Sequence, residues 1–300
     1  ATKIFSKLVS EKKSKGYTEG ESGTPYQHSE KQSAGVQCQL LNAIDEEEAS
    51  RLVADDRWCM QEKLDGRRML IQRKDAAIHG INRRGLLIGL PEPVFQIARV
   101  LQGNFILDGE AIGDVFHVFD LLEVNGFCIR KLPYRERWSQ LLDLLDPIEQ
   151  ENLRIVPAAC ERGAKLELLR RLKQQNREGV VFKRLDAPYM SGRPNSGGTQ
   201  LKHKFYATLS ACVLKVNEQR SVEIGLLNNK ARWQTAGNVT IPPNATVPRQ
   251  GEIIEVRYLY AFKESGCLFQ PTYLGPRTDL TLLACVAEQM KFKAGEDEEG

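Results

Sequence analysis

A short turn at Gly113-Asp114 separates two apolar runs, residues 104–107 ahead of Asp108-Gly109-Glu110 and residues 115–120 behind the turn. Turn residues between two strand-like runs are typical of an antiparallel hairpin. We expect the first strand to end at Asp108-Gly109-Glu110, so that carboxylates of both strands meet. Other strand-like runs lie at residues 68–72, 77–81 and 178–183, and helical periodicity lies at residues 45–53, 91–101, 134–145 and 165–176. The mixture predicts an α+β domain built around this hairpin.

Short β-like runs alternate with turns from residue 206 onward, at residues 210–216, 222–227 and 252–259. This spacing predicts a small all-β barrel. A chain of 300 residues is long enough for two domains with sizeable cores. We therefore expect an α+β domain at residues 36–205 and a β-barrel domain at residues 206–290, between a polar arm at residues 1–35 and an acidic tail at residues 291–300.

The composition, with 41% hydrophobic and 27% charged residues and a net charge of +3, is that of an ordinary globular protein. No apolar run approaches the roughly 18 residues of a membrane span, and no basic-then-apolar leader opens the sequence. The seven cysteines form no Cys-x-x-Cys pair and no metal-ligand spacing with the four histidines. Such a scattered set predicts reduced thiols, and we expect a cytoplasmic, nucleoid-associated protein without a membrane partner.

Lys63 lies in the stretch from Gln61 to Arg68, just ahead of the turn signal Asp65-Gly66. A strand that ends at this turn would present the lysine to a pocket. A lysine amine is nucleophilic when it is deprotonated, and nearby cations or loss of water favour that state. Lys63 is therefore a candidate covalent nucleophile. Taken alone, the motif is more typical of a charged hairpin turn, and the motifs that follow it decide between the two interpretations.

Five motifs follow one another along the chain: Lys-x-Asp-Gly-x-Arg at residues 63–68, Asp-Gly-Glu at residues 108–110, Phe-Asp at residues 119–120, Glu-Gly-Val-Val-Phe-Lys at residues 178–183 and Leu-Lys-x-Lys at residues 201–204. In this order the sequence resembles the covalent nucleotidyltransferase superfamily of DNA ligases, RNA ligases and messenger-RNA capping enzymes over residues 36–285. It is most similar to ATP-dependent DNA ligases. The resemblance implies a nucleotidyltransferase domain of packed antiparallel sheets with helices, a nucleotide between the sheets, and an OB-fold barrel behind it.

The resemblance also implies a role for each matching residue. Lys63 would take AMP from ATP, and Glu110 and Glu178 would hold Mg²⁺ or Mn²⁺. Carboxylate oxygens at strand ends suit such a metal, which keeps most of its waters. The nucleotide contacts would be Gln61 at the adenine edge, Asp65 and Arg68 holding the nucleotide, Arg83 on ribose or phosphate, Glu110 again, Phe119 stacked on adenine, Lys183, Lys202 and Lys204 at the phosphates, and Arg277 at the pyrophosphate.

Some of these residues fit simpler interpretations, and one motif departs from the family pattern. Taken singly, Phe119 fits core packing and Arg83 fits a solvated loop. Gln61 can donate as well as accept a hydrogen bond, so it separates ATP from GTP less strictly than a carboxylate would. DNA ligases and capping enzymes carry Arg-x-Asp-Lys on the barrel domain, and the best match here is Arg277-Thr278-Asp279-Leu280. The leucine puts efficient self-adenylation in doubt.

Residues 162–204 hold 11 lysines and arginines against three acids. A basic band in a nearly neutral chain predicts a track for a polyanion, although a solvated helix face has the same composition. Six cations of this band lie outside the nucleotide motifs: Arg162, Lys165, Arg170, Arg171, Lys173 and Arg193. We expect some of them to hold duplex phosphates, with Arg170, Arg171, Lys173 and Arg193 as the candidate binding residues.

Together these features predict a monomeric ATP-dependent ligase that seals 5′-phosphate/3′-hydroxyl nicks in duplex DNA. The reaction would pass through a lysyl-AMP and an adenylated-DNA intermediate, and acceptance of RNA-containing strands stays open. An RNA ligase, a GTP-dependent capping enzyme and a non-catalytic nucleic-acid-binding module are the alternatives. Residues 5–19 also resemble the end of a WGR domain, a nucleic-acid-binding module, although too little of it is present to fold as one.

Overall fold

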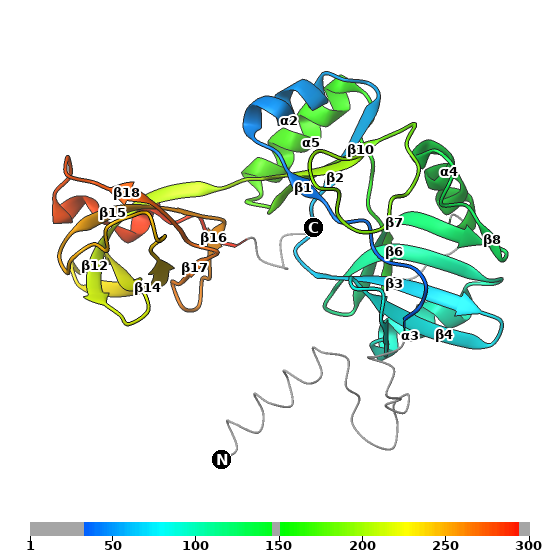
Figure 1. Cartoon of the computed structure of the whole chain (residues 1–300), viewed down its shortest axis with the longest axis horizontal. Coiled ribbons are helices and arrows are strands. Elements are labelled where there is room, and N and C mark those ends of the chain that lie inside the picture. Colours follow the sequence, from blue (N-terminus) through cyan, green and yellow to red (C-terminus); the bar gives the residue numbers. More distant parts are fainter. Residues whose placement is uncertain (1–32, 146–150, 294–300) are drawn as a thin grey trace, which may run out of the picture. The chain divides into compact units, whose positions relative to one another are not determined.

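A computed structural model describes residues 33–145 and 151–293, which divide into two compact units (Figure 1). The first unit contains the chain up to Leu168 together with Val180–His203, and the second contains Leu169–Gly179 and the chain from Lys204 onward. The resemblance to a WGR domain and most of the acidic tail lie outside the described residues. Within the described residues, no helix combines the length and apolar character that a membrane span requires.

The largest sheet of the first unit has seven strands in the order β5-β4-β3-β6-β7-β8, with β9 paired to β7. Their bounds are β3 Arg67–Lys74, β4 Ala77–Asn82, β5 Leu87–Ile88, β6 Phe105–Ile112, β7 Val115–Val124, β8 Phe127–Cys128 and β9 Leu153–Ile155. The expected hairpin is confirmed, because β6 and β7 pair in antiparallel register from Ile112 opposite Val115.

One detail of the hairpin differs from the expectation. Strand β6 runs on through Asp108-Gly109-Glu110 to Ile112, with an irregularity in its pairing with β7 between Asp108 and Gly109. A Cβ atom at Gly109 would lie 2.4 Å from Cζ of Phe116 and 2.5 Å from the carbonyl oxygen of His117. A glycine is therefore needed at residue 109 because β6 packs closely against β7 there. The strand continues through this residue, and no turn forms.

A second sheet in the order β1-β11-β10-β2 carries the lysine-containing motifs. Its strands are β1 Asn42–Ala43, β2 Trp58–Glu62, β10 Gly179–Arg184 and β11 Gln200–Lys204. The expectation of antiparallel sheets is only partly right, because β1 pairs with β11 and β7 pairs with β9 in parallel. For β7 and β9 the reason is connectivity, since helix α4 (Tyr134–Leu145) lies between them in the sequence and allows the chain to return in the same direction.

Helices α2 Glu46–Val53, α3 Glu92–Val100, α4 Tyr134–Leu145 and α5 Arg162–Gln174 correspond to the four helical patterns. The side chain of Asp45 caps α2 by accepting a hydrogen bond of 2.8 Å from the Glu48 N–H. Helices α3 and α4 pack on one face of the seven-stranded sheet, with Ile97 and Leu141 in the same core as Leu107 of β6. This packed face supports the strands that carry the site.

The second unit contains a five-stranded antiparallel sheet in the order β14-β13-β12-β15-β18 and a small β16-β17 pair. The bounds are β12 Ala207–Val216, β13 Ser221–Leu227, β14 Trp233–Thr240, β15 Ile253–Tyr258, β16 Tyr260–Ala261, β17 Leu268–Phe269 and β18 Thr272–Pro276, followed by short 3-10 helices at Leu282–Ala284 and Ala287–Gln289. The edge strands β14 and β18 also approach each other. The unit is therefore built almost entirely of strands, as expected.

Candidate nucleotide-binding site

A pocket of the first unit receives side chains from both of its sheets. From β2 and the loop behind it, from β3, β6 and β7, and from β10 and β11, the lining residues are Leu41, Gln61, Glu62, Lys63, Leu64, Arg68, Glu110, Phe119, Val181, Lys183 and Gln200. Six of the residues expected at a nucleotide site are among them: Gln61, Lys63, Arg68, Glu110, Phe119 and Lys183. The distant motifs thus converge on one cavity.

Lys63 follows the last residue of β2, in the loop that leads into β3. Its amine is partly buried and donates a hydrogen bond of 3.2 Å to the Leu64 carbonyl. The turn behind it packs against β6, because the Gly66 N–H donates to Glu110 Oε1 at 3.1 Å and a Cβ at Gly66 would lie 2.5 Å from the Ala111 carbonyl oxygen. A glycine is therefore required here, and the turn holds Lys63 at the pocket.

Arg68 is anchored by a carboxylate beneath the pocket. Its Nε and Nη2 each lie 2.7 Å from one oxygen of Asp108, which is fully buried and also accepts a hydrogen bond of 2.9 Å from the Tyr189 hydroxyl. Burial disfavours the charged guanidinium, but the Asp108 carboxylate outweighs this and raises the pKa of Arg68. Arg68 is thus a fixed cation in the pocket wall.

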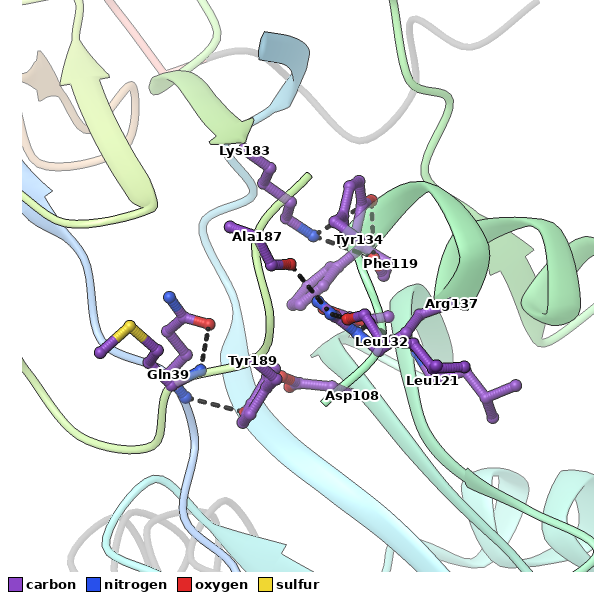
Figure 2. Close-up of polar contacts among 12 residues, drawn as sticks. Gln39, Asp108, Phe119, Leu121, Leu132, Tyr134, Arg137, Lys183, Ala187 and Tyr189 are labelled. Atoms are coloured by element: carbon purple, nitrogen blue, oxygen red, sulfur yellow. Dashed lines mark hydrogen bonds and ion pairs between the residues drawn. The ribbon is translucent and has the colours of Figure 1, made fainter. Parts of the chain in front are cut away.

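Figure 2 shows the Lys183 side chain pointing toward Phe119 and Tyr134. The guanidinium carbon of Arg68 lies 4.2 Å and the amine of Lys183 lies 4.4 Å from the centroid of the Phe119 ring. The Lys183 amine donates to the Phe119 carbonyl at 2.9 Å, and burial lowers the pKa of Lys183 to about 8. The Phe119 ring therefore already has two cation–π partners, Arg68 and Lys183. The Lys183 amine is also hydrogen-bonded to the backbone of β7.

Gln61 is held in one orientation by two neighbours. Its Nε2 donates to the Val156 carbonyl at 2.7 Å, and its Oε1 lies 3.2 Å from the Tyr134 hydroxyl. That hydroxyl also lies 3.0 Å from the Phe119 carbonyl oxygen and 3.4 Å from the Lys183 amine. Gln61 is 1% exposed, so any further hydrogen bond of its amide group would be made inside the protein.

Known proteins are similar to this chain in sequence. Residues 56–198 match the family model described as RNA ligase. A probable DNA ligase of Streptomyces coelicolor is 31% identical over 204 residues, which cover 57% of this chain and 39% of the relative. One from Anaeromyxobacter dehalogenans is 30% identical over 221 residues, covering 62% of this chain and 42% of the relative. The chain is thus similar in sequence to proteins named probable DNA ligases. It spans about two fifths of the length of these curated relatives.

Solved ligase structures agree on the fold. A mycobacterial DNA ligase D complexed with ATP and MES superposes with a TM-score of 0.51 at 18% identity, covering 84% of this chain and 98% of that one. A Lig E DNA ligase gives a TM-score of 0.59 at 17% identity, covering 80% of this chain and 99% of that one. At these identities the likeness establishes a ligase-type fold.

Six other residues expected at the nucleotide or metal site do not line the pocket, and three of them are Asp65, Arg83 and Arg277. Asp65 lies in the loop with Lys63, and Arg83 lies exposed in the turn between β4 and β5. Arg277 belongs to the second unit, where it pairs with Asp279 at 2.8 Å. Leu280 packs against the core of that unit, which gives a physical reason for leucine at the position of the motif lysine. Direct nucleotide contacts by Asp65, Arg83 and Arg277 stay predictions.

The second lysine motif divides between the units. Lys202 lies in β11 opposite Ala43, and Lys204 ends that strand. Lys204 belongs to the second unit, as does Glu178, and the two form an ion pair of 2.7 Å. The carboxylate expected to bind a metal is therefore neutralised by a lysine expected to bind phosphate. Across residues 33–145 and 151–293 no group of three or more His, Cys, Asp or Glu side chains could hold a metal ion.

One cation of the basic band is not available to a duplex. Lys165 is fully buried and donates to the carbonyls of Asp55 at 2.8 Å and Leu52 at 3.4 Å, so it links α5 to the end of α2. Only packing against α2 reveals this role. Arg193 is exposed but donates to the Leu41 carbonyl at 2.7 Å. Four other cations of the band, Arg162, Arg170, Arg171 and Lys173, are exposed.

Sequence reasoning missed several residues that support this pocket. Asp120 and Arg137 form a buried pair between β7 and α4, and Arg137 also donates to the carbonyls of Leu132 and Ala187 (Figure 2). A signal existed, because Arg137 lies on the same helical stripe as Tyr134, Trp138 and Leu141. An arginine on an apolar stripe indicates a buried partner.

Gln200 was missed as well, and the sequence carried no signal for it. The side chain is 4% exposed and lines the pocket, and its Oε1 is buried with no hydrogen-bond partner among the described residues. An orphaned buried acceptor is costly in a folded protein. Its position in the pocket wall suits a hydrogen-bond donor of a bound ligand.

Proposed function

We propose that this chain is an ATP-dependent polynucleotide ligase that seals nicks between a 5′-phosphate and a 3′-hydroxyl in duplex DNA. The observation that carries the proposal is the convergence of Lys63, Arg68, Glu110, Phe119 and Lys183 on one pocket. A nucleophilic amine, a fixed cation, a carboxylate and an aromatic ring are what nucleotidyl transfer to a lysine requires. The curated relatives of the chain are probable DNA ligases.

The chemistry would run in three displacements. The Lys63 amine attacks the α-phosphate of ATP, the bond to pyrophosphate breaks, and a lysyl-AMP forms. The 5′-phosphate of the nick then displaces the lysine and becomes adenylated. Finally the 3′-hydroxyl displaces AMP and closes the strand. Each displacement gathers negative charge on phosphate oxygens, and the guanidinium of Arg68 is positioned to offset it in the pocket.

The residues present fit a divalent metal that binds mainly through water and phosphate. Glu110 lines the pocket and accepts a hydrogen bond from the Gly66 N–H through Oε1, and its carboxylate is the kind of hard oxygen ligand that such a metal prefers. Mg²⁺ commonly uses only one or two protein carboxylates, so the absence of a larger cluster among the described residues does not conflict with it. Glu110 would hold Mg²⁺ or Mn²⁺, and Glu178 would do so after release from Lys204. The ion would supply positive charge to the phosphates.

We also propose that the second unit is an OB-fold. Its five antiparallel strands and the approach of edge strands β14 and β18 support a partly open barrel. The exposed residues Arg170, Arg171 and Lys173 would hold duplex phosphates. We propose that the ligase acts as a monomer on nicked DNA in the nucleoid.

The first test is covalent labelling. The purified chain is incubated with α-labelled ATP or α-labelled GTP and Mg²⁺, then denatured, and protein-bound label is measured. We expect retention of label from ATP. Retention from GTP alone would replace the ligase with a capping-type enzyme, and nick binding without any covalent label would indicate a non-catalytic module.

The match to the RNA ligase model favours a second test, on strand identity. A nicked duplex is prepared in the four DNA and RNA combinations of the strands flanking the nick. We expect the all-DNA nick to be sealed fastest. Sealing confined to RNA strands would make the chain an RNA ligase with the same first step.

A further inference from the structure

Cys59 and Cys160 face each other across a short stretch of antiparallel backbone. Met60 in β2 and Ala159 form an antiparallel bridge, and each N–H donates to the other's carbonyl at 2.8 Å. In antiparallel pairing, the residues next to such a hydrogen-bonded pair form a non-hydrogen-bonded pair, with Cα atoms about 4.5 Å apart. Cys59 and Cys160 occupy that neighbouring position.

This placement matches the geometry of a disulfide. Linked cysteines have Cα atoms roughly 4.4–6.8 Å apart, and the spacing of about 4.5 Å that is typical of such a pair falls inside that range. The side chains of a non-hydrogen-bonded pair also lie closer together than those of a hydrogen-bonded pair. Cys59 is fully buried, whereas Cys160 is exposed, so an oxidant can reach one sulfur and the second lies beside it.

The electrostatics separate the roles of the two sulfurs. The hydrogen bond with Cys59, assisted by Lys165 and opposed by burial and Glu161, lowers the pKa of Cys160 to about 6. The same hydrogen bond and burial raise the pKa of Cys59 well above its usual value. At neutral pH, Cys160 is therefore mainly the reactive thiolate and Cys59 the protonated thiol that resolves it.

We propose that Cys160 and Cys59 form a peroxide-sensitive dithiol site that closes to a reversible disulfide. The Cys160 thiolate attacks hydrogen peroxide, its sulfur becomes a sulfenic acid, and hydroxide leaves. The Cys59 sulfur then attacks the sulfenic sulfur, the S–S bond forms, and water leaves with the Cys59 proton. Two thiols are oxidised and one peroxide is reduced to water, so the electrons balance. The inference does not depend on ligase activity.

The disulfide would tie the strand that carries Gln61 to the segment around Ala159. The Gln61 side chain already donates a hydrogen bond to the Val156 carbonyl in that segment. The link would close a loop of about 100 residues in the unfolded chain, so the oxidised protein should unfold at a higher temperature than the reduced one. The site would also protect Cys160 from irreversible oxidation.

The test exposes the reduced full chain to a slight excess of hydrogen peroxide at neutral pH, blocks free thiols and digests with trypsin. We expect a cross-link between the peptides of residues 58–63 and 155–162 that dithiothreitol removes, and a raised melting temperature that dithiothreitol reverses. The Cys160 thiol should disappear on the order of tenfold or more faster than that of buried Cys285, because the thiolate is the reacting form. Cys160 oxidised to sulfinic acid while Cys59 stays a thiol would overturn the proposal.

Two variants separate the pair from general oxidation. Cys160→Ser, at an exposed position, should fold normally, form no cross-link and lose the peroxide-dependent rise in melting temperature. Cys128→Ser removes another exposed thiol, whose pKa is also lowered, with Arg130 as its neighbour. It should leave the cross-link and its rate unchanged. A cross-link that depends on Cys128, or a thermal shift that persists in Cys160→Ser, would refute the assignment.

Discussion

Arg137 donates two hydrogen bonds to Asp120, with distances of 2.9 Å from Nε to Oδ1 and 3.0 Å from Nη2 to Oδ2. Both side chains are 1% exposed, so the pair joins α4 to β7 entirely within the protein. Burial disfavours the guanidinium charge, but Asp120 outweighs it and raises the pKa of Arg137. Phe119, which lines the pocket, is the residue before Asp120 in β7. The Asp120–Arg137 pair therefore holds in place the strand that carries Phe119.

Removing one partner of this pair should be strongly destabilising. Asp120→Ala leaves the Arg137 charge buried without its partner and should lower the free energy of unfolding by about 3–5 kcal/mol. Urea denaturation measures this, with the exposed Arg184–Asp186 pair as control, where Asp186→Ala should change stability little. Replacing both members, Asp120→Leu with Arg137→Met, should recover much of the loss. A double variant as unstable as the single one would mean that the pair stabilises in its own right.

Lys63→Ala should abolish covalent labelling by ATP, because it removes the only amine that the proposed mechanism uses as a nucleophile. Sealing of a nick supplied with a 5′-adenylate should persist, since the last displacement needs no lysine nucleophile. Both activities are measured on the same preparation, with Lys74→Ala at the exposed end of β3 as the matched control. Equal loss of both activities would indicate that Lys63 has a structural role.

The buried amine of Lys183 predicts a stability change with pH. Burial lowers the pKa of Lys183 to about 8, against an ordinary value of 10.5. Between these values the unfolded chain binds this proton more fully than the folded chain, so the free energy of unfolding should rise with pH. Relative to Lys183→Met, the wild type should gain stability from pH 8 to pH 10.5 and show no trend below pH 7. Parallel urea-denaturation profiles across the range would contradict the lowered pKa.

The exposed cations of α5 should contribute to nick binding through phosphates. Arg170→Glu with Arg171→Glu should weaken binding and flatten its salt dependence by roughly 0.9 log units per log unit of salt for each lost contact. Labelling of Lys63 by ATP should be unchanged. Arg99→Glu, another exposed helix arginine, serves as the control for net charge. Wild-type affinity and salt slope in the double variant would identify α5 as a solvated face only.

Local sequence patterns determined much of the site. The order of motifs that resembles the covalent nucleotidyltransferases singled out a lysine ahead of Asp65-Gly66, a carboxylate at residue 110, an aromatic ring at residue 119 and a lysine at residue 183. All four residues line the pocket. Strand periodicity and turn formation depend mainly on residues that are close together in the sequence. The sequence alone can therefore place such side chains near strand ends.

Only the tertiary structure decided what holds those side chains. Asp108 beneath Arg68, Arg137 against Asp120, and the orphaned Gln200 amide in the pocket depend on contacts between strands and helices far apart in the chain. Lys165 belongs to the same class, since its burial comes from packing against α2. The spacing of residues along a chain gives the direction of a side chain within its own element. It does not give the partner that neutralises a charge, because that partner is brought in by packing between elements.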